Sequence, residues 1–321
     1  MRYLVTGGAG FIGSHLVEHL VAAGHDVVVL DDFSTGRREN LAAVADRVHL
    51  LEGSVTDSEV CRGAMADVDC VLHQAAATSV QRSVDEPLAT HHANATGTLN
   101  VLVAARAARV RRVVYAGSTS AYGNPVTLPN SEDHVTRPMS PYAASKLAGE
   151  EYCSAFHAAY GLETVVLRYV NIFGPRQDPH SQYAAVVPQF IAAALQAEPP
   201  TIYGDGNQTG DFVYVANVVH ANVLAARAPA ARVAGQVFNV GCAQSVSIND
   251  LWDRIQTLTG APVLPRHVGG RPGEVRNSLA SIDKARELVG YEPVVDFDEG
   301  LRQTVAYYRA HRRDRRRVRA A

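Results

Sequence analysis

The fold class is indicated by Gly7-Gly8-Ala9-Gly10-Phe11-Ile12-Gly13. This stretch directly follows a short apolar run at residues 2–6, which is typical of a strand, and leads into a stretch with helical spacing at about 14–24. Its glycines at 7, 10 and 13 permit a tight turn that brings backbone N–H groups close to a pyrophosphate, while the helix N-terminus adds partial positive charge. The pattern predicts a dinucleotide site after the first strand.

An acidic residue stands where such a site needs one. Asp31 follows the apolar β-branched run 27–30, which predicts a second strand. A carboxylate there accepts the hydroxyls of the adenosine ribose and repels a 2′-phosphate, so NAD is favoured over NADP. Arg37 and Arg38 follow shortly afterwards and leave NADP open as an alternative.

Strand and helix patterns alternate along the first half of the chain. Further strands are predicted at 49–52, 70–73, 112–116 and 164–168, and further helices at about 88–108 and 142–160. Because the strands are apolar on both faces, we predict an α/β fold, a Rossmann-like doubly wound parallel sheet.

Prolines and glycines become frequent after residue 172, which indicates a smaller, mixed α/β substrate lobe. We expect an NAD-binding domain at 1–171, to which about 213–242 return. The substrate lobe is expected at 172–212 and 243–311, followed by a basic tail at 312–321 that is expected to be solvated.

Composition excludes several classes of protein. The 321 residues carry a net charge of −2, so no global field favours nucleic acid, and no apolar run reaches the roughly 18 residues of a membrane span. The four cysteines are scattered, and no secretory signal or metal-ligand spacing is visible, so we expect a cytoplasmic protein without a metal. Of the 30 basic residues only Lys146 and Lys284 are lysines, so a retained lysine is more apt to need an ammonium.

Tyr142 and Lys146 stand four residues apart in a predicted helix and therefore share a face. An ammonium beside a phenol favours phenolate, and a general base works best with a pKa near 7. Lowering a tyrosine pKa from about 10 by three units costs about 4 kcal/mol. The pair lies about 130 residues after the glycine turn and follows Gly117-Ser118-Thr119-Ser120 at the end of a predicted strand. We therefore predict oxidation of a substrate alcohol.

Over nearly its whole length the chain resembles the extended short-chain dehydrogenase/reductases, specifically the nucleotide-sugar epimerase/dehydratase group. The resemblance depends on the following motifs: Thr6 to Ser14, Asp31-Asp32-Phe33, His73-Gln74-Ala75-Ala76, Asn94 to Thr98, Ser118 to Tyr122-Gly123, Ser140-Pro141-Tyr142 to Lys146, Leu167-Arg168-Tyr169 to Asn171, Phe173 to Gln177, and Arg271-Pro272-Gly273-Glu274.

The resemblance implies a role for each matching position. Ser118, Tyr142 and Lys146 match the catalytic residues. The implied NAD ligands are Gly7, Gly10, Phe11, Ile12, Gly13, Asp31, Asp32, Ser34, Gly36, Ser54, Val55, Ala75, Ala76, Asn94, Tyr142, Lys146 and Tyr169. The implied UDP-sugar contacts are Ser118, Thr119, Tyr142, Asn171, Ala185, Val186, Tyr203, Arg271, Glu274 and Ser278. In relatives, helices matching 88–108 and 142–160 pair into a four-helix bundle, so a homodimer is expected.

Two positions bear on the reaction and the substrate. Dehydratases of the group carry Asp-Glu where this chain has Thr119-Ser120, so the resemblance favours 4-epimerisation through a transient 4-keto sugar. Ser278 matches a position where glucose/galactose-restricted epimerases carry a bulky Tyr, and a small residue leaves room for a 2-acetamido group. UDP-GlcNAc and UDP-GalNAc are the expected pair, with UDP-Glc and UDP-Gal as a second.

Alternatives remain open. They are UDP-glucuronate 4-epimerisation, with Arg176 recruited to the carboxylate, 4,6-dehydration, 4-ketoreduction, and a non-catalytic NAD-binding protein. Three positions also depart from the family. Gly210 stands where an Arg usually contacts the diphosphate, Ser54 replaces an Asp near the adenine, and Ser181-Gln182 replaces Gly-Ala. Losing the Arg removes a charge-assisted contact of about 1.5–3 kcal/mol.

Overall fold

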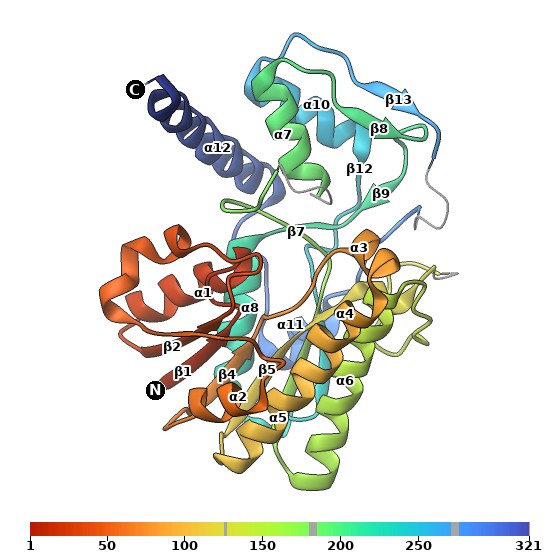
Figure 1. The fold of residues 1–321 in the computed structure, drawn as a ribbon. Coiled ribbons are helices and arrows are strands. Elements are labelled where there is room, and N and C mark those ends of the chain that lie inside the picture. The colour runs from red at the N-terminus through yellow and green to blue at the C-terminus, as the bar shows by residue number, and fades with distance from the viewer. Residues whose placement is uncertain (125–126, 180–184, 271–275, 321) are drawn as a thin grey trace.

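The computed structural model describes residues 1–124, 127–179, 185–270 and 276–311, and the helical backbone of 312–320. Its centre is a seven-stranded sheet in the order β11-β6-β5-β4-β1-β2-β3, in which every neighbouring pair is parallel (Figure 1). The strands are β1 (Arg2–Thr6), β2 (Asp26–Asp31), β3 (His49–Glu52), β4 (Cys70–His73), β5 (Arg112–Ser118), β6 (Glu163–Tyr169) and β11 (Gln236–Val240). The predicted Rossmann-like α/β class is confirmed.

Helices cover both faces of this sheet. Along β1, Tyr3 and Val5 point into one buried cluster and Leu4 into the other, which is why the strand is apolar throughout. The first cluster is covered by α1 (Phe11–Ala22), the 3-10 segment η1 (Arg38–Arg47), α8 (Val215–Arg227), α9 (Ala230–Val233) and α11 (Asp283–Val289). The second cluster is covered by α2 (Ser58–Ala64), α5 (Gly97–Ala107) and α6 (Pro141–Tyr160).

A smaller lobe with its own apolar core lies beyond the carboxyl ends of these strands (Figure 1). Phe173, Phe190, Trp252 and Phe297 are buried in that core. Its helices are α7 (Val186–Gln196), α10 (Ile248–Thr259) and α12 (Phe297–Ala320). Its three two-stranded sheets pair β7 (Asn171–Phe173) with β10 (Phe212–Tyr214), β9 (Thr209–Gly210) with β12 (Val246–Ser247), and β8 (Thr201–Tyr203) with β13 (Arg266–Val268). The domain boundaries expected from the sequence stay a prediction.

One predicted helix differs in detail. The sequence predicts a continuous helix at about 88–108, but α4 (Pro87–His91) and α5 are joined by a π-helical turn, η2 (His92–Thr96). The Asn94 carbonyl inside this turn accepts a hydrogen bond from the Thr98 hydroxyl at 2.6 Å. The Asn94 amide bonds residues outside the helix, and these bonds hold the widened turn, which a simple periodicity does not reveal.

Two short elements follow strands of the central sheet. They are α3 (Val80–Asp85) after β4 and the 3-10 turn η3 (Thr119–Tyr122) after β5. In the described part of the chain, no helix is both long and apolar enough to cross a membrane.

Candidate active site

The glycine turn lies between β1 and α1 and has no room for added atoms. A Cβ at Gly13 would stand 2.1 Å from the Gly7 carbonyl oxygen, which is backbone against backbone. Gly7 has φ +64°, and its Cβ would lie 2.8 Å from the backbone of Ala75. Gly10 is the N-cap of α1, so the first N–H groups of the helix, at Phe11 and Ile12, have no partner within it. The glycines therefore keep the turn tight, and the first N–H groups of α1 can bind a pyrophosphate.

Asp31 at the end of β2 lies beside this turn and is 6% exposed. One carboxylate oxygen accepts the Ala9 N–H at 2.8 Å and the other accepts the Phe33 N–H at 2.9 Å. Burial raises the pKa of Asp31, while these hydrogen bonds act in the opposite direction. Each oxygen keeps a free lone pair for a ribose hydroxyl. Asp31 thus also fixes the glycine turn, a role that the sequence pattern did not indicate.

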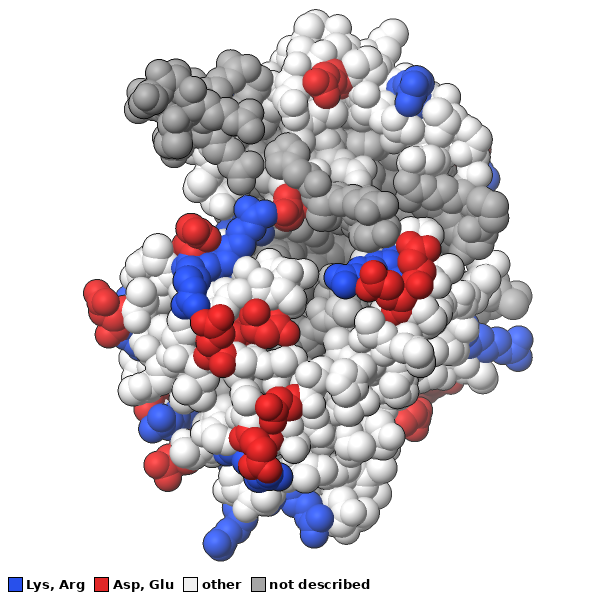
Figure 2. Space-filling view, in the orientation of Figure 1, with Lys and Arg blue, Asp and Glu red and all other residues white. Residues whose placement is uncertain are grey.

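The two arginines that kept NADP open are both paired with carboxylates. Arg37 bonds Asp178, in the segment between β7 and α7, at 2.5 Å, and Arg38 bonds Glu52. Figure 2 shows basic and acidic side chains lying next to one another on this face of the molecule. The two pairs leave neither guanidinium as an uncompensated charge for a 2′-phosphate, which agrees with NAD as the cofactor.

The other predicted contacts at the adenosine end lie in local turns. Asp32 accepts the Ser34 N–H at 3.0 Å and its hydroxyl at 2.6 Å. A Cβ at Gly36 would stand 2.5 Å from the Asp31 carboxylate, so this position needs glycine. The Ser54 hydroxyl accepts the Thr56 hydroxyl at 3.0 Å, and the next residue, Val55, is buried.

A buried hydrogen-bonded chain links the glycine turn to the π-helical turn. The Thr6 hydroxyl lies 2.7 Å from His73 Nδ1, and His73 Nε2 lies 3.0 Å from the Thr98 hydroxyl. Since Thr98 donates to the Asn94 carbonyl, His73 must donate from Nε2 and accept at Nδ1. Burial lowers the pKa of His73 to about 3, so it stays neutral. The Thr6 oxygen then accepts the Ala75 N–H and orients the Ala75–Ala76 segment.

Asn94 continues this chain toward the predicted catalytic helix. It accepts the Ala77 N–H at 2.7 Å and donates to the Ala77 carbonyl at 3.0 Å and to the Ser145 hydroxyl at 2.9 Å. Ser145 in turn donates to the Tyr142 carbonyl at 2.8 Å. Asn94 is 1% exposed, so its side chain serves to position Ala77 and Ser145.

Ser118 and Tyr142 meet at the carboxyl end of β5. A hydrogen bond with Ser118 lowers the pKa of the Tyr142 phenol, against a larger rise caused by burial among its neighbours. The Ser118 hydroxyl also pairs with the Ser120 hydroxyl at 2.8 Å. Thr119 donates instead to the Tyr169 carbonyl at 3.1 Å, which leaves only its oxygen lone pairs for a substrate.

Lys146 lies one helical turn beyond Tyr142 and is 4% exposed. Burial lowers its pKa to about 7. Among the described residues no carboxylate pairs with its ammonium, since Glu150, the next acid along α6, is held by Arg168. A lone phenolate at Tyr142 or a lone ammonium at Lys146 is therefore unfavourable in this buried site. Each charged form is stabilised when the other residue carries the opposite charge.

Tyr169, a predicted NAD contact, is nearly enclosed. Its hydroxyl accepts the Asn222 amide at 2.7 Å and contacts Gln74, and burial raises its pKa to about 12. It remains a neutral phenol that ties β6 to the β4 end and to α8.

The predicted sugar end gathers segments that are far apart in sequence. The Asn171 amide donates to the Asp211 carbonyl at 3.1 Å and lies 3.5 Å from the Ser278 hydroxyl. The Ser278 N–H donates to the Thr209 carbonyl at 3.0 Å. The fold thus places Asn171 and Ser278 beside the strand that carries Gly210.

Gly210 itself has little space around it. A Cβ there would stand 2.9 Å from the Asn171 amide nitrogen and 3.2 Å from the Phe212 ring. The Asn171 side chain therefore occupies the room that an arginine at 210 would need.

The remaining predicted sugar contacts fall in three places. Tyr203 is half-buried at the end of β8, and its carbonyl accepts the Gln208 amide at 2.7 Å. Ala185 is the N-cap of α7, which begins at Val186. Arg271, Glu274, Ser181 and Gln182 lie outside the described residues.

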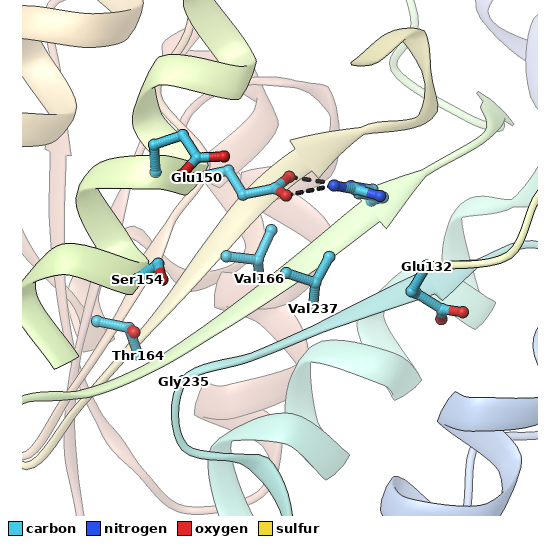
Figure 3. A pocket seen from close by; sticks show the side chains of 9 residues that line it. Glu132, Glu150, Ser154, Thr164, Val166, Gly235 and Val237 are labelled. Atoms are coloured by element: carbon cyan, nitrogen blue, oxygen red, sulfur yellow. Dashed lines mark hydrogen bonds and ion pairs between the residues drawn. The ribbon is translucent and has the colours of Figure 1, made fainter. Parts of the chain in front are cut away.

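A cavity of about 210 Å³ lies between α6 and strands β6 and β11 (Figure 3). Glu132, Glu150 and Glu151 line it, together with the buried Arg168. None of the residues predicted to contact the cofactor or the sugar lines it.

Comparison with known proteins agrees with this geometry. Residues 3–241 match the sequence profile of the NAD dependent epimerase/dehydratase family. The chain belongs to this family. It is 43% identical over 314 residues to a UDP-glucose 4-epimerase of Mycolicibacterium smegmatis, covering 96% of this chain and 99% of the relative.

Two solved structures are also similar. A UDP-glucose 4-epimerase of Thermotoga maritima with UDP-glucose is 38% identical, with a TM-score of 0.92 over 97% of this chain and 99% of that one. A UDP-N-acetylglucosamine 4-epimerase of Methanobrevibacter ruminantium, in complex with UDP-N-acetylmuramic acid, is 37% identical, with a TM-score of 0.92 over 97% and 98%. The family relationship and NAD as the cofactor, predicted from the motifs, are confirmed.

Proposed function

We propose that this protein is an NAD-dependent UDP-sugar 4-epimerase whose main pair is UDP-GlcNAc and UDP-GalNAc, with UDP-Glc and UDP-Gal as a second. The observation that carries the proposal is the meeting of Ser118 and Tyr142 at the carboxyl end of β5, with Lys146 one helical turn farther along. The names of the relatives support the same reaction.

In this proposal the protein's side chains orient the substrate alcohol and transfer its proton. Ser118 orients the sugar C4 oxygen, and Tyr142 accepts the hydroxyl proton and later returns it. Lys146 stabilises the phenolate by its charge. NAD, when bound, supplies the oxidation and reduction of the sugar carbon. The glycine turn, Asp31 and the Ala75–Ala76 segment would hold it, because the first N–H groups of α1 can bind a pyrophosphate and the Asp31 carboxylate can accept ribose hydroxyls.

The sugar is assigned from the residues around Asn171. Ser278 is half-buried and close to Asn171, and a serine side chain leaves the volume that a 2-acetamido group requires. A uronic acid is less well supported, because Arg176 already pairs with Glu18 on α1. Dehydration is disfavoured because the Ser120 hydroxyl, rather than a carboxylate, lies beside Ser118.

A homodimer and a cytoplasmic location complete the proposal. Large apolar side chains are exposed on the helices that the resemblance assigns to a dimer or on those next to them, namely Val84 at 57%, Leu88 at 84%, Val103 at 49% and Tyr160 at 52%. Such a face is typical of an interface. A monomeric mass in solution would contradict the dimer. The four cysteines are free, as is usual in a reducing compartment.

The substrate assignment is tested with a panel of nucleotide sugars. Purified protein, without added NAD, is incubated with UDP-GlcNAc, UDP-Glc and UDP-glucuronate, and the products are separated. We expect UDP-GalNAc to form fastest. Conversion of UDP-glucuronate alone would refute the assignment of the sugar.

The assignment of the base is tested by Tyr142→Phe. Removing the phenolic oxygen should lower kcat by about 10²–10⁴-fold, because no other described hydroxyl stands beside Ser118 with a lysine one turn away. NAD content, measured on the purified protein, should be unchanged. Tyr152→Phe on the exposed side of the same helix is the matched control and should keep full activity. A Tyr142→Phe variant with normal turnover would exclude the mechanism.

A further inference from the structure

The aromatic ring of Tyr115 lies against the Lys146 ammonium. Tyr115 belongs to β5, is 0% exposed, and has its ring centroid 4.4 Å from Lys146 Nζ. A cation within about 6 Å of the face of an aromatic ring is attracted by the ring quadrupole, and the attraction is strongest where water is excluded. Neither residue 115 nor an aromatic ring at this place was indicated by the sequence motifs.

The same tyrosine also holds the backbone of Lys146. Its hydroxyl donates to the Lys146 carbonyl at 3.1 Å. The hydroxyl reaches the helix because residue 149 is glycine, where a Cβ would stand 2.3 Å from the phenolic oxygen. The Tyr115 ring thus contacts the Lys146 ammonium, and its hydroxyl holds the Lys146 backbone through the space left by Gly149.

The other groups around Lys146 give its charge little support. His73 approaches from β4 and is neutral, with its ring 5.6 Å from the Tyr115 ring. Cys153 on the same helix acts to raise the pKa of Lys146, but burial raises the pKa of this thiol above its usual range, so it stays neutral. Tyr142 is the phenol one turn before Lys146, and Glu150 is occupied by Arg168, as Figure 3 shows. The ring face therefore favours the ammonium at a place where no described carboxylate does.

We infer that Tyr115 is a positioning residue that keeps Lys146 charged and correctly placed beside Tyr142. The inference rests on the proposed roles of Tyr142 and Lys146. It assigns a function in the reaction to a side chain that otherwise counts as part of the apolar core. It also explains how a lysine without a described carboxylate partner can remain an ammonium in a buried site.

The chain offers a direct test, because Lys146 and Lys284 are its only lysines. The holoenzyme is labelled with [ε-13C]lysine, and the two signals are assigned with Lys284→Arg. The titration of Lys146 is then followed by NMR in wild type, Tyr115→Phe and Tyr115→Leu. We expect the Lys146 midpoint to fall by about one pH unit in Tyr115→Leu, because the ring is lost, and to stay nearly unchanged in Tyr115→Phe. The alkaline limb of turnover should move by the same amount.

Two further measurements separate this role from packing. Mono-, di- and pentafluorophenylalanine at position 115 weaken the ring quadrupole with little change of shape, so the Lys146 midpoint should fall stepwise with fluorination even if Tyr115→Leu folds poorly. Tyr3→Leu, a buried tyrosine in β1, is the control and should leave the midpoint unchanged. A midpoint that ignores fluorination, or rises, overturns the inference. A wild type that epimerises no UDP-sugar refutes the proposed function instead, and the NMR titration remains readable.

Discussion

The predicted cofactor end and the predicted sugar end of the site are built from different parts of the chain. At the cofactor end, glycines, backbone N–H groups and the buried Asp31 pack so closely that a Cβ at Gly13 would stand 2.1 Å from the Gly7 carbonyl oxygen. At the sugar end, the side chains of Asn171 and Ser278 come from separate segments and contact each other at 3.5 Å. The cofactor end therefore requires glycines without side chains and cannot accept an added Cβ. The sugar end can be altered by exchanging one side chain for another.

The largest effect is expected from Gly13→Ala. Its Cβ would stand 2.1 Å from the Gly7 carbonyl, and two backbones cannot separate without opening the turn. We expect loss of bound NAD, a clearly lower Tm and at least about 100-fold less activity. NAD absorbance and thermal melting of the purified variant measure this.

The matched control for Gly13→Ala is Gly63→Ala in α2. Nothing lies within 4 Å of a Cβ at Gly63, and alanine in a helix is favoured over glycine by about 0.8–1 kcal/mol. This variant should be neutral or slightly stabilised. Normal NAD binding by Gly13→Ala would show that the turn is looser than its geometry indicates.

A middle-sized effect is expected from Ser278→Tyr. A bulky ring beside Asn171 should take the volume proposed for the 2-acetamido group, so kcat/KM for UDP-GlcNAc should fall about tenfold or more. The value for UDP-Glc should change much less. Ser278→Ala removes only a hydroxyl and serves as the control. Equal losses for both sugars would place the selectivity elsewhere in the pocket.

The smallest effect is expected from breaking the Arg37–Asp178 pair, which connects the two ends. Arg37 donates its backbone N–H to the Ala9 carbonyl of the glycine turn, while Asp178 lies in the segment between β7 and α7. Exposed pairs contribute about 0.2–1 kcal/mol, so Arg37→Met or Asp178→Asn should speed NAD release by about 1.5–5-fold.

Arg38→Met controls for the loss of a charge, because its pair with Glu52 stays within the nucleotide-binding part. It should not alter NAD release. If Arg37→Met changes the KM for the sugar but not NAD release, the ion pair acts on sugar binding and the expected effect on the cofactor is wrong.

Much of the fold followed from local patterns. The predicted strands at 49–52 and 70–73 match β3 and β4, and the helix predicted at 142–160 matches α6 within one residue. The π-helical turn at His92–Thr96 was not predicted, because Asn94 departs from helical geometry to bond Ala77 and Ser145, residues brought near only by folding.

Features that depend on short spacings could be read directly from the amino-acid sequence. Glycines at fixed intervals require a tight turn, and residues four apart in a helix share a face, so the glycine turn and the Tyr142–Lys146 register could be predicted. Only the tertiary structure decided which distant side chains meet. Packing between elements places the Tyr115 ring against Lys146 and places Asn171 beside Ser278, next to Gly210. The spacing of residues along the chain does not predict such contacts.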